Sequence, residues 1–561
     1  MLRAMQTTNI FAHARPTRVQ IALWAGSLVG MLLLATRHWE KYSIGIFYDD
    51  AFYALLPRSL LYTAQYGNFF MPADFYRADF PFGFPLLLTP LAALFPNYAP
   101  VLRLVPLAAS ALSLSLLFWG WTRLTRNFSY WWGTTLVVLL AFSPLTILFA
   151  RLLFSEAAFL LWSLIVYWLT ERMLSGHKPS AVLLGAAAVA MVSTRTVGWI
   201  ILATLFVYVI LKLERAWRAL SVVALSAGIV TAILILLTPI TTGDFFPTQY
   251  LQPITGTYTA ARAPTPSAAP SEAATSVNAF ALLGQRAERA VNSFLFHLDF
   301  TDWLPARFQN QVRQFLDANG LNAFKLLPGI LLLFVLAFGA RRWYRRSGLT
   351  AFAIIVPPYL LTLLVWAWEG SRMYYPIQPQ LLLILLLGVY EILEWLAHFL
   401  PRETARRTVQ IFSLCGVSAI LLASLAVNLT SSGWFVARTN RDAYSNWILT
   451  QTPKDAVILT GEPATDYLYA PRVYAPIPYS ANTAQAFIEY LRAYNITYVI
   501  APAPDNPRAD LVAMRAPRAV QYHETVQQLV AQHILMPRYN VFDADVTIYQ
   551  VDTTKVQTHI K

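Results

Sequence analysis

The chain has 561 residues, of which 57% are hydrophobic and only 13% are charged. A soluble protein has about 25% charged residues, so this composition excludes a chain whose whole surface faces water and requires lipid to cover much of it. The net charge of +13 does not indicate nucleic-acid binding, because the basic residues lie in short clusters between apolar runs.

Apolar runs suited to crossing a membrane recur through most of the chain, and a crossing helix needs about 20 residues. They predict an α-helical polytopic membrane protein with about 11 transmembrane helices. The runs are Val19–Thr36, Pro100–Trp121, Trp131–Phe149, Leu152–Leu169, Ala181–Thr194, Val197–Leu211, Leu220–Leu237, Leu326–Ala340, Leu349–Trp366, Pro376–Leu393 and Val409–Val427. The short pair on either side of Arg195 also fits a single re-entrant hairpin.

Basic residues fall in every second loop between these runs, which predicts the side of the membrane on which each loop lies. The clusters are Arg3, Arg15 and Arg18, then Arg123 and Arg126, Arg172 and Lys178, Lys212, Arg215 and Arg218, Arg341, Arg342, Arg345 and Arg346, and finally Arg402, Arg406 and Arg407. Short basic loops are retained in the cytoplasm. We therefore expect a plasma-membrane protein with a cytoplasmic N-terminus, a first span that is not cleaved, and outer loops at 37–98 and 239–325.

The first outer loop begins with an acidic pair. Tyr48-Asp49-Asp50 is followed by apolar residues at helical spacing as far as Thr63, and Gly67-Asn68 provides a stop signal. This predicts an amphipathic helix with both aspartates at its N-terminus. The later stretch Leu86–Phe95 is too short to cross and is expected to lie in the membrane interface. In the long loop, Thr257–Ser276 indicates a flexible lid or linker.

The sequence changes character after about residue 430. Short apolar runs at Ala456–Leu459, Tyr498–Ala501 and Val546–Val551 predict strands, and Ala484–Tyr494 and Glu524–His533 predict helices. We expect a transmembrane domain at 1–430 and a small extracytoplasmic α/β domain at 431–561. The single cysteine, Cys415, allows neither an intrachain disulfide nor a cysteine metal site.

Charged residues near or inside membrane spans are costly and usually functional. Those expected at the outer ends of the spans are Asp49, Asp50, Arg151, Glu156, Arg195, Glu369 and Arg372. A carboxylate can accept the proton of an attacking hydroxyl, and guanidinium groups match the oxygens of phosphate. Together these residue types indicate a group transfer from a phosphorylated lipid at the outer surface.

Structural explanations compete with each of these roles. The acidic pair suits a helix N-cap, where aspartate is favoured. Arg151 and Glu156 fit an ion pair between adjacent spans, and Arg195 and Arg372 fit interfacial anchors whose long side chains reach the surface.

The ordered set of motifs resembles that of the GT-C membrane glycosyltransferases, in the branch of protein O-mannosyltransferases, aminoarabinose lipid A transferases and their bacterial relatives. The resemblance extends from about Val19 to Leu400. The residues that carry it are Tyr48–Tyr53, Asp79–Pro85, Arg103–Pro106, Arg151–Glu156, Thr194–Gly198 and Arg372–Pro376. The C-terminal segment resembles the small soluble domain that many of these enzymes carry.

The resemblance implies a polyprenyl-phosphate-linked sugar donor and an acceptor hydroxyl on a glycan, lipid or protein at the outer leaflet. It implies that Asp49 is the catalytic base, with Asp50 beside it where relatives often have glutamate. Relatives carry an acidic residue near the acceptor at the position of Glu156. From their expected position at the outer face and the match of guanidinium to phosphate, we assign the donor phosphate to Arg151, Arg195 and Arg372. The residues predicted to bind the acceptor or sugar are Glu156, Asp79, Tyr53 and Glu369. The resemblance implies no cofactor, and a divalent cation stays open.

Proteins of other classes share parts of this pattern. A flippase for lipid-linked sugars needs the membrane domain and the arginines, but not an outer carboxylate after the first span. A structural membrane protein that presents the C-terminal domain needs neither. An oligosaccharide ligase is expected to use basic outer residues. The acidic pair beside the arginines favours the transferase.

Overall fold

The structure, a computed structural model, describes residues 15–37, 39, 44–45, 49–76, 78, 80–96, 98–177, 179–212, 216–237, 327–365, 371–399, 401–430, 441–478, 483–502, 517–541 and 546–558. The chain divides into two compact units. Unit 1 comprises Met1–Trp39, Arg103–Leu234 and Val277–Gly433, and unit 2 comprises Glu40–Leu102, Ile235–Ser276 and Trp434–Lys561. The division predicted at residues 430 and 431 stays a prediction.

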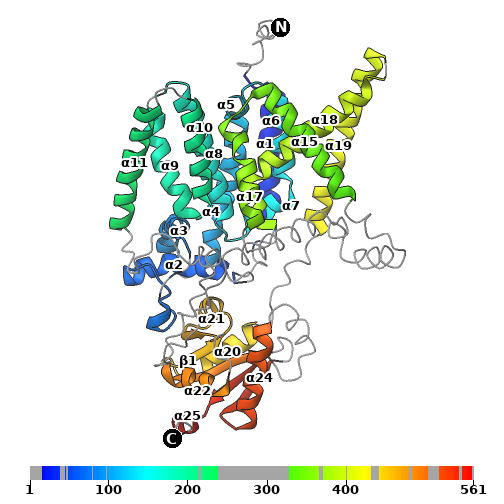
Figure 1. Cartoon of the computed structure of the whole chain (residues 1–561). Coiled ribbons are helices and arrows are strands. Elements are labelled where there is room, and N and C mark those ends of the chain that lie inside the picture. The colour runs from blue at the N-terminus through cyan, green and yellow to red at the C-terminus, as the bar shows by residue number, and fades with distance from the viewer. Residues whose placement is uncertain are drawn as a thin grey trace, which may run out of the picture. The chain divides into compact units, whose positions relative to one another are not determined.

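Unit 1 is a bundle of helices that run side by side (Figure 1). In chain order they are α1 (Arg18–Thr36), α4 (Leu104–Trp119), α5 (Trp121–Thr125), α6 (Tyr130–Ala141), α7 (Pro144–Arg151), α8 (Glu156–Leu174), α9 (Pro179–Thr194), α10 (Gly198–Lys212), α11 (Ala216–Leu237), α15 (Leu327–Ser347), α16 (Ala351–Ile354), α17 (Val356–Val365), η9 (Ser371–Ile377), α18 (Gln378–Ala397) and α19 (Arg402–Thr430). Helix α8 is central, because it packs against α4, α9, α10 and η9.

The prediction of a polytopic membrane protein is confirmed. Among the described residues, five helices are long and apolar enough to cross a membrane, and a bent pair raises the number to six. The five are Arg18–Thr36, Ala99–Trp119, Glu156–Leu174, Tyr374–Ala397 and Glu403–Thr430; shorter apolar helices lie at Gly83–Leu94, Ser180–Thr194, Gly198–Lys212, Trp217–Ile233 and Ala351–Thr362. The finer count of eleven spans stays a prediction, as does their orientation.

The run predicted as one span at Trp131–Phe149 is divided in two. Helices α6 and α7 meet at an angle of 60°. The break falls at Ser143-Pro144, where proline occupies the first turn of α7 and lacks the N–H that a continuous helix would need. The two runs around Arg195 form separate helices, α9 and α10.

Helices α15 and α18 cross at two glycines. A Cβ at Gly339 would lie 1.8 Å from the carbonyl oxygen of Ile384, and a Cβ at Gly388 would lie 1.9 Å from that of Val335. Only glycine therefore permits the two backbones to approach so closely. Beside the crossing, Arg342 of α15 forms ion pairs with two glutamates of α18.

The first part of unit 2 is the segment after the first span. It contains α2 (Asp49–Thr63), η4 (Ala73–Phe75), α3 (Gly83–Leu94) and η5 (Ala99–Arg103). The helix predicted from the acidic pair to Thr63 is confirmed by α2, but it is buried on every side from Asp50 to Pro57 rather than on one face. Tyr53 of α2 packs against Phe84 of α3, with ring centroids 4.9 Å apart.

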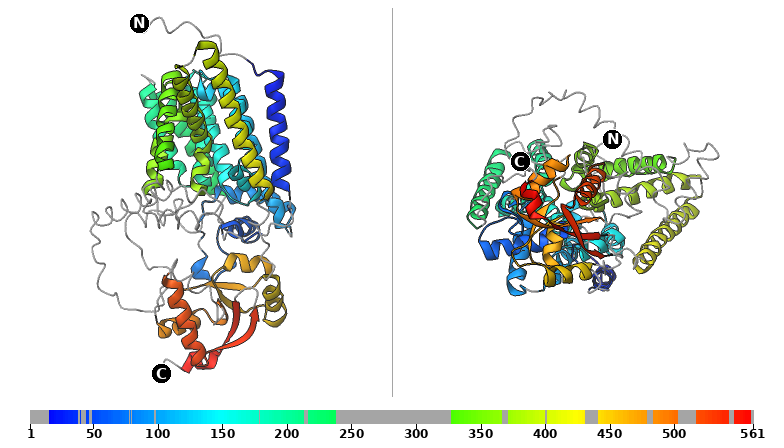
Figure 2. Two further views of the ribbon diagram at one scale, coloured as in Figure 1. Left: turned by 90° about the vertical axis from the view of Figure 1, so that its right-hand side faces the viewer. Right: turned by 90° about the horizontal axis from the view of Figure 1, so that it is seen from below.

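The predicted C-terminal α/β fold is confirmed, since the end of the chain forms a sheet with helices packed around it (Figure 2). The sheet has five strands in the order β2-β1-β3-β5-β4. The strands are β1 (Val457–Thr460), β2 (Val473–Pro476), β3 (Ile496–Pro502), β4 (Leu535–Val541) and β5 (Val546–Val551), and the helices are α20 (Arg441–Gln451), α21 (Pro463–Tyr469), α22 (Ala484–Ala493), α24 (Pro517–Ala531) and α25 (Thr553–Thr558). Strand β1 is parallel to β2 and β3, whereas β5 is antiparallel to β3 and β4.

Each face of this sheet has its own core, because successive strand residues point to opposite faces. Leu459 and Val499 share one core with α22, α24 and α25. Their neighbours Ile458 and Ile500 share the other with α20. The sheet is therefore the middle layer of three.

The segment after the first span packs onto this domain within unit 2. Phe75 of η4 joins the core on the α22 side, and the ring of Phe69 lies 5.3 Å from that of Tyr467 in α21. The backbone N–H of Tyr474 in β2 donates to the carbonyl of Phe70 at 2.9 Å. The α2–α3 segment and the C-terminal sheet therefore form one folded body.

Candidate functional site

The first group of predicted site residues lies in unit 1 at the N-terminal end of α8. Glu156 is 1% exposed, and its Oε1 atom forms an ion pair with Nη1 of Arg195. The Nε atom of Arg372 lies 3.8 Å from the same oxygen. Three residues that are distant in sequence therefore lie together: Glu156 at the start of α8, Arg195 between α9 and α10, and Arg372 in η9.

The other carboxylate oxygen of Glu156, Oε2, is buried and has no hydrogen-bond partner among the described residues. An unpartnered buried acceptor costs about 1–3 kcal/mol, so the environment of this oxygen requires an explanation. The side chain of Arg372 is 36% exposed and that of Arg195 is 16% exposed. The cluster thus offers an acceptor and a partly accessible guanidinium.

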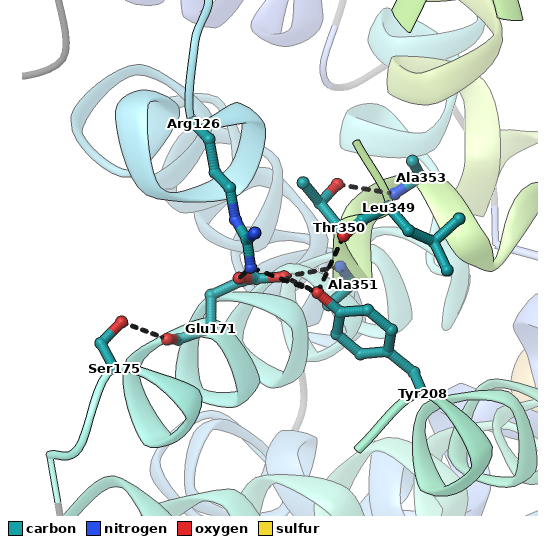
Figure 3. Close-up of polar contacts among 8 residues, drawn as sticks. All are labelled: Arg126, Glu171, Ser175, Tyr208, Leu349, Thr350, Ala351 and Ala353. Carbon is teal, nitrogen blue, oxygen red and sulfur yellow. Dashed lines mark hydrogen bonds and ion pairs between the residues drawn. The ribbon is translucent and has the colours of Figure 1, made fainter. Parts of the chain in front are cut away.

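A second buried glutamate on the same helix shows the contrast. Glu171, near the C-terminal end of α8, accepts from Nη2 of Arg126 at 2.7 Å, from the hydroxyl of Tyr208 at 2.8 Å and from the backbone N–H of Ala351 at 2.7 Å (Figure 3). The Tyr208 hydroxyl oxygen also lies 3.1 Å from the carbonyl oxygen of Leu349. Glu171 is a fully bonded structural junction, whereas Glu156 is not.

Arg151, at the end of α7, is bonded to the end of α1. Its Nε atom donates to the carbonyl of Ala35 at 3.2 Å, and its Nη2 atom donates to that of Leu34. The last carbonyls of a helix lack intrahelical partners and attract cations. These two bonds suit a helix-end cap, and the predicted phosphate role of Arg151 stays a prediction.

The second group lies in unit 2, where the two aspartates of α2 differ. Asp50 is 2% exposed, and its Oδ2 and Oδ1 atoms accept from the backbone N–H groups of Gly45 at 2.8 Å and Ala51 at 3.0 Å. Asp49, the first residue of the helix, is half-buried. Asp50 therefore bonds to backbone N–H groups at the start of α2 without the geometry of an N-cap, and Asp49 is the more accessible carboxylate.

The remaining predicted residues are placed as follows. Tyr53 is 5% exposed and packs between α2 and α3, with its ring 5.1 Å from Phe80. Asp79 and Glu369 lie outside the described residues. The structure therefore brings Glu156, Arg195 and Arg372 together and shows Asp49 and Asp50 adjacent on α2.

Comparisons with known proteins bear on the fold. Neither a protein-family model nor a curated protein sequence matches the chain. An oligosaccharyltransferase from Archaeoglobus fulgidus, solved with a tethered acceptor peptide, aligns with 94% of this chain and 74% of its own at 14% identity and a TM-score of 0.53. The same enzyme, AglB, solved with an inhibitory peptide and a dolichol-phosphate, aligns with 96% of this chain and 75% of its own at 12% identity and a TM-score of 0.52.

The chain is structurally similar to GT-C membrane glycosyltransferases. ArnT from Cupriavidus metallidurans, bound to undecaprenyl phosphate, aligns over 95% of this chain and 98% of its own at 12% identity, with a TM-score of 0.45. At 12% and 14% identity, the two oligosaccharyltransferase alignments show the fold alone, and the activity has to be argued from the residues.

The described residues do not test the possible divalent cation, since Asp79 and Glu369 are not among them. No group of three or more His, Cys, Asp or Glu side chains that could hold one occurs in the described ranges. Both oxygens of Asp50 accept backbone N–H groups, which leaves that carboxylate poorly placed as a ligand.

Sequence reasoning missed two neighbours of the Glu156 cluster. Ser155 is 0% exposed, and its hydroxyl lies 3.4 Å from Nη1 of Arg195. Tyr359 of α17 is 1% exposed and lies within electrostatic range of both Arg195 and Glu156. A serine next to a site residue carries a weak sequence signal, and a tyrosine some 200 residues away along the chain carries none.

Proposed function

We propose that this protein is a membrane glycosyltransferase that moves a sugar from a polyprenyl-phosphate-linked donor to an acceptor hydroxyl on the extracytoplasmic face. The observation that carries the proposal is the cluster of Arg195, Arg372 and Glu156, in which two guanidinium groups meet one buried carboxylate. The GT-C-like fold supports the class of reaction.

The charge of the cluster suits a phosphodiester. Two arginines and one glutamate carry a net charge of about +1, which one phosphodiester of a lipid-linked sugar neutralises. Arg372, the more exposed of the two arginines, is assigned to the phosphate oxygens, and Arg195 is held in place by Glu156. The free Oε2 atom of Glu156 is assigned to a hydroxyl of the sugar or acceptor.

The transfer itself is assigned to Asp49. The acceptor oxygen attacks the anomeric carbon, the bond from that carbon to the phosphate oxygen breaks, and its electron pair leaves with the polyprenyl phosphate. The proton of the acceptor hydroxyl passes to the Asp49 carboxylate. Phosphate is a good leaving group, so one carboxylate is sufficient and a single displacement inverts the anomeric configuration, unlike hydrolysis by two carboxylates.

The test is sugar transfer by the purified full-length protein in liposomes. The donors are undecaprenyl phosphate linked to mannose, glucose or arabinose, and the acceptors are a panel of glycans, lipids and peptides. Asp49→Asn is expected to lower turnover by about 10²–10⁴-fold, the usual contribution of a general base. Binding of undecaprenyl phosphate should be unchanged, because the amide keeps the size of the side chain.

Asp50→Asn is the matched variant. It should lower turnover less and lower thermal stability more, because the carboxylate accepts two backbone N–H groups. Near-normal transfer by Asp49→Asn would exclude Asp49 as the base. Translocation of the lipid-linked sugar without transfer would favour the flippase instead.

A further inference from the structure

The turn at Ile44–Gly45 connects the acidic start of α2 to another part of unit 2. The N–H of Gly45 donates to Oδ2 of Asp50 at 2.8 Å. The carbonyl of Ile44, on the other side of the same peptide, accepts from the hydroxyl of Tyr469 at 2.8 Å. One peptide unit therefore links Asp50 to the end of α21 in the C-terminal domain.

Gly45 is also in close steric contact with α21. Its φ angle is +96°, in the region that favours glycine, and a Cβ atom there would lie 2.1 Å from Cγ2 of Thr465. The hydroxyl of Thr465 lies 3.5 Å from the carbonyl oxygen of Gly45. Thr465 is 0% exposed, so it has little freedom to move away.

Helix α21 is itself firmly held to the sheet. Asp466 is 2% exposed, and its Oδ1 and Oδ2 atoms accept from the hydroxyls of Tyr444 in α20 and Thr460 in β1, each at 2.6 Å. A buried carboxylate with two charge-assisted bonds is a rigid junction. Hydrogen bonds therefore connect the sheet to α21, α21 to the Ile44–Gly45 turn, and the turn to Asp50.

We propose that the C-terminal domain positions the catalytic aspartate: Tyr469 and Thr465 hold the Ile44–Gly45 turn, the turn holds Asp50, and Asp50 fixes the direction in which its neighbour Asp49 projects. Tyr469, Thr465 and Gly45 are positioning residues, because they act through the backbone and Asp50. The effect on turnover rests on the function proposed above. The mechanical link is tested without it.

Hydrogen–deuterium exchange of the full-length protein in detergent measures the link. Tyr469→Phe removes only the hydroxyl that bonds to Ile44. Exchange of the amides of residues 49–54 should rise about fivefold, the change expected for one lost neutral hydrogen bond. Tyr494→Phe is the matched control, since the Tyr494 hydroxyl bonds to Asp74 at 3.2 Å, away from the turn. It should leave residues 49–54 unchanged, and equal effects of the two variants would overturn the proposal.

A second pair of variants tests the steric contact. Gly45→Ala places a methyl group against Thr465 and should raise exchange at residues 49–54 by about fivefold or more. Gly176→Ala has the same kind of backbone strain, with φ +89°, but nothing lies within 4 Å of its Cβ position. The proposal requires the increase in the first variant and its absence in the second.

The effect on catalysis is measured as sugar transfer from the undecaprenyl-phosphate-linked donors named above. Tyr469→Phe should lower kcat roughly tenfold with unchanged KM for the donor, because a misplaced base slows the chemical step. Tyr494→Phe should leave both constants unchanged. If exchange rises in Tyr469→Phe while kcat stays unchanged, the positioning of Asp49 is refuted even though the link is real. Failure of Asp49→Asn to lose activity would refute the proposed base and leave the exchange result standing.

Discussion

Two buried glutamates on α8 differ in how completely their carboxylate oxygens are hydrogen-bonded. Glu171 and Glu156 are 3% and 1% exposed, so burial alone does not distinguish them. Glu171 accepts from a guanidinium, a hydroxyl and a backbone amide. Glu156 has one oxygen in an ion pair and another without a partner among the described residues. Both oxygens of Glu171 are therefore occupied within the protein, whereas one oxygen of Glu156 has no partner among the described residues.

This difference predicts opposite results for the same substitution. Glu171→Gln should destabilise the protein by about 2 kcal/mol, because bonds to a charged acceptor are worth about 1.5–3 kcal/mol. Glu156→Gln should change stability less. It should also strengthen binding of undecaprenyl phosphate by roughly tenfold, because the cluster loses the negative charge that opposes the phosphate.

Thermal unfolding midpoints and binding of undecaprenyl phosphate, both measured in the same detergent, check this pair. Each variant serves as the control of the other, since both remove one carboxylate from the same helix. A larger loss of stability in Glu156→Gln, or weaker phosphate binding, would contradict the assignment.

At the scale of elements, α2 was the most predictable part of the site. Two acidic residues at its start, an amphipathic spacing and Gly67-Asn68 after its end agree on the same helix. The sequence predicted β1, β3 and β5, because these strands are apolar and each lies between two other strands of the sheet. Strands β2 and β4 were missed because both are edge strands that contain proline, which edge positions tolerate.

The close approach of α15 and α18 leads to a testable prediction at the scale of elements. Gly388→Ala should lower stability by about 1–3 kcal/mol, the usual cost of overpacking, because the new Cβ meets the backbone oxygen of Val335. Neither backbone can yield without breaking helical hydrogen bonds. The measurement is the thermal unfolding midpoint of the full-length protein in detergent.

Gly416→Ala in α19 is the matched control, since nothing lies within 4 Å of its Cβ position. Alanine is favoured over glycine inside a helix by about 1 kcal/mol, so this variant should be neutral or slightly stabilising. Equal destabilisation by both variants would mean that the close approach of α15 and α18 does not contribute to stability.

At the scale of the whole molecule, composition and the distribution of apolar runs were sufficient to predict a polytopic membrane protein with a C-terminal α/β domain. The pairing of Glu156 with Arg372 could not be predicted, because 216 residues separate them in the sequence and no local pattern encodes such a contact. The packing of η4 onto the C-terminal sheet was missed for the same reason. Local periodicity identifies elements, whereas contacts between distant segments depend on the complete fold.

Orientation in the membrane is the last prediction and follows from charge. Short loops with lysine and arginine are retained in the cytoplasm, and such loops alternate with acidic or neutral ones along this chain. A reporter fused at Lys178, after α8, should therefore lie in the cytoplasm, and one fused at Lys561 should lie outside. A fluorescent protein that folds only in the cytoplasm and a phosphatase that is active only outside should give opposite signals at the two positions. A fusion at Lys212, after α10, serves as the control and should match Lys178. Signals from the same side at Lys178 and Lys561 would remove the extracytoplasmic placement of the C-terminal domain, and with it the proposed location of sugar transfer.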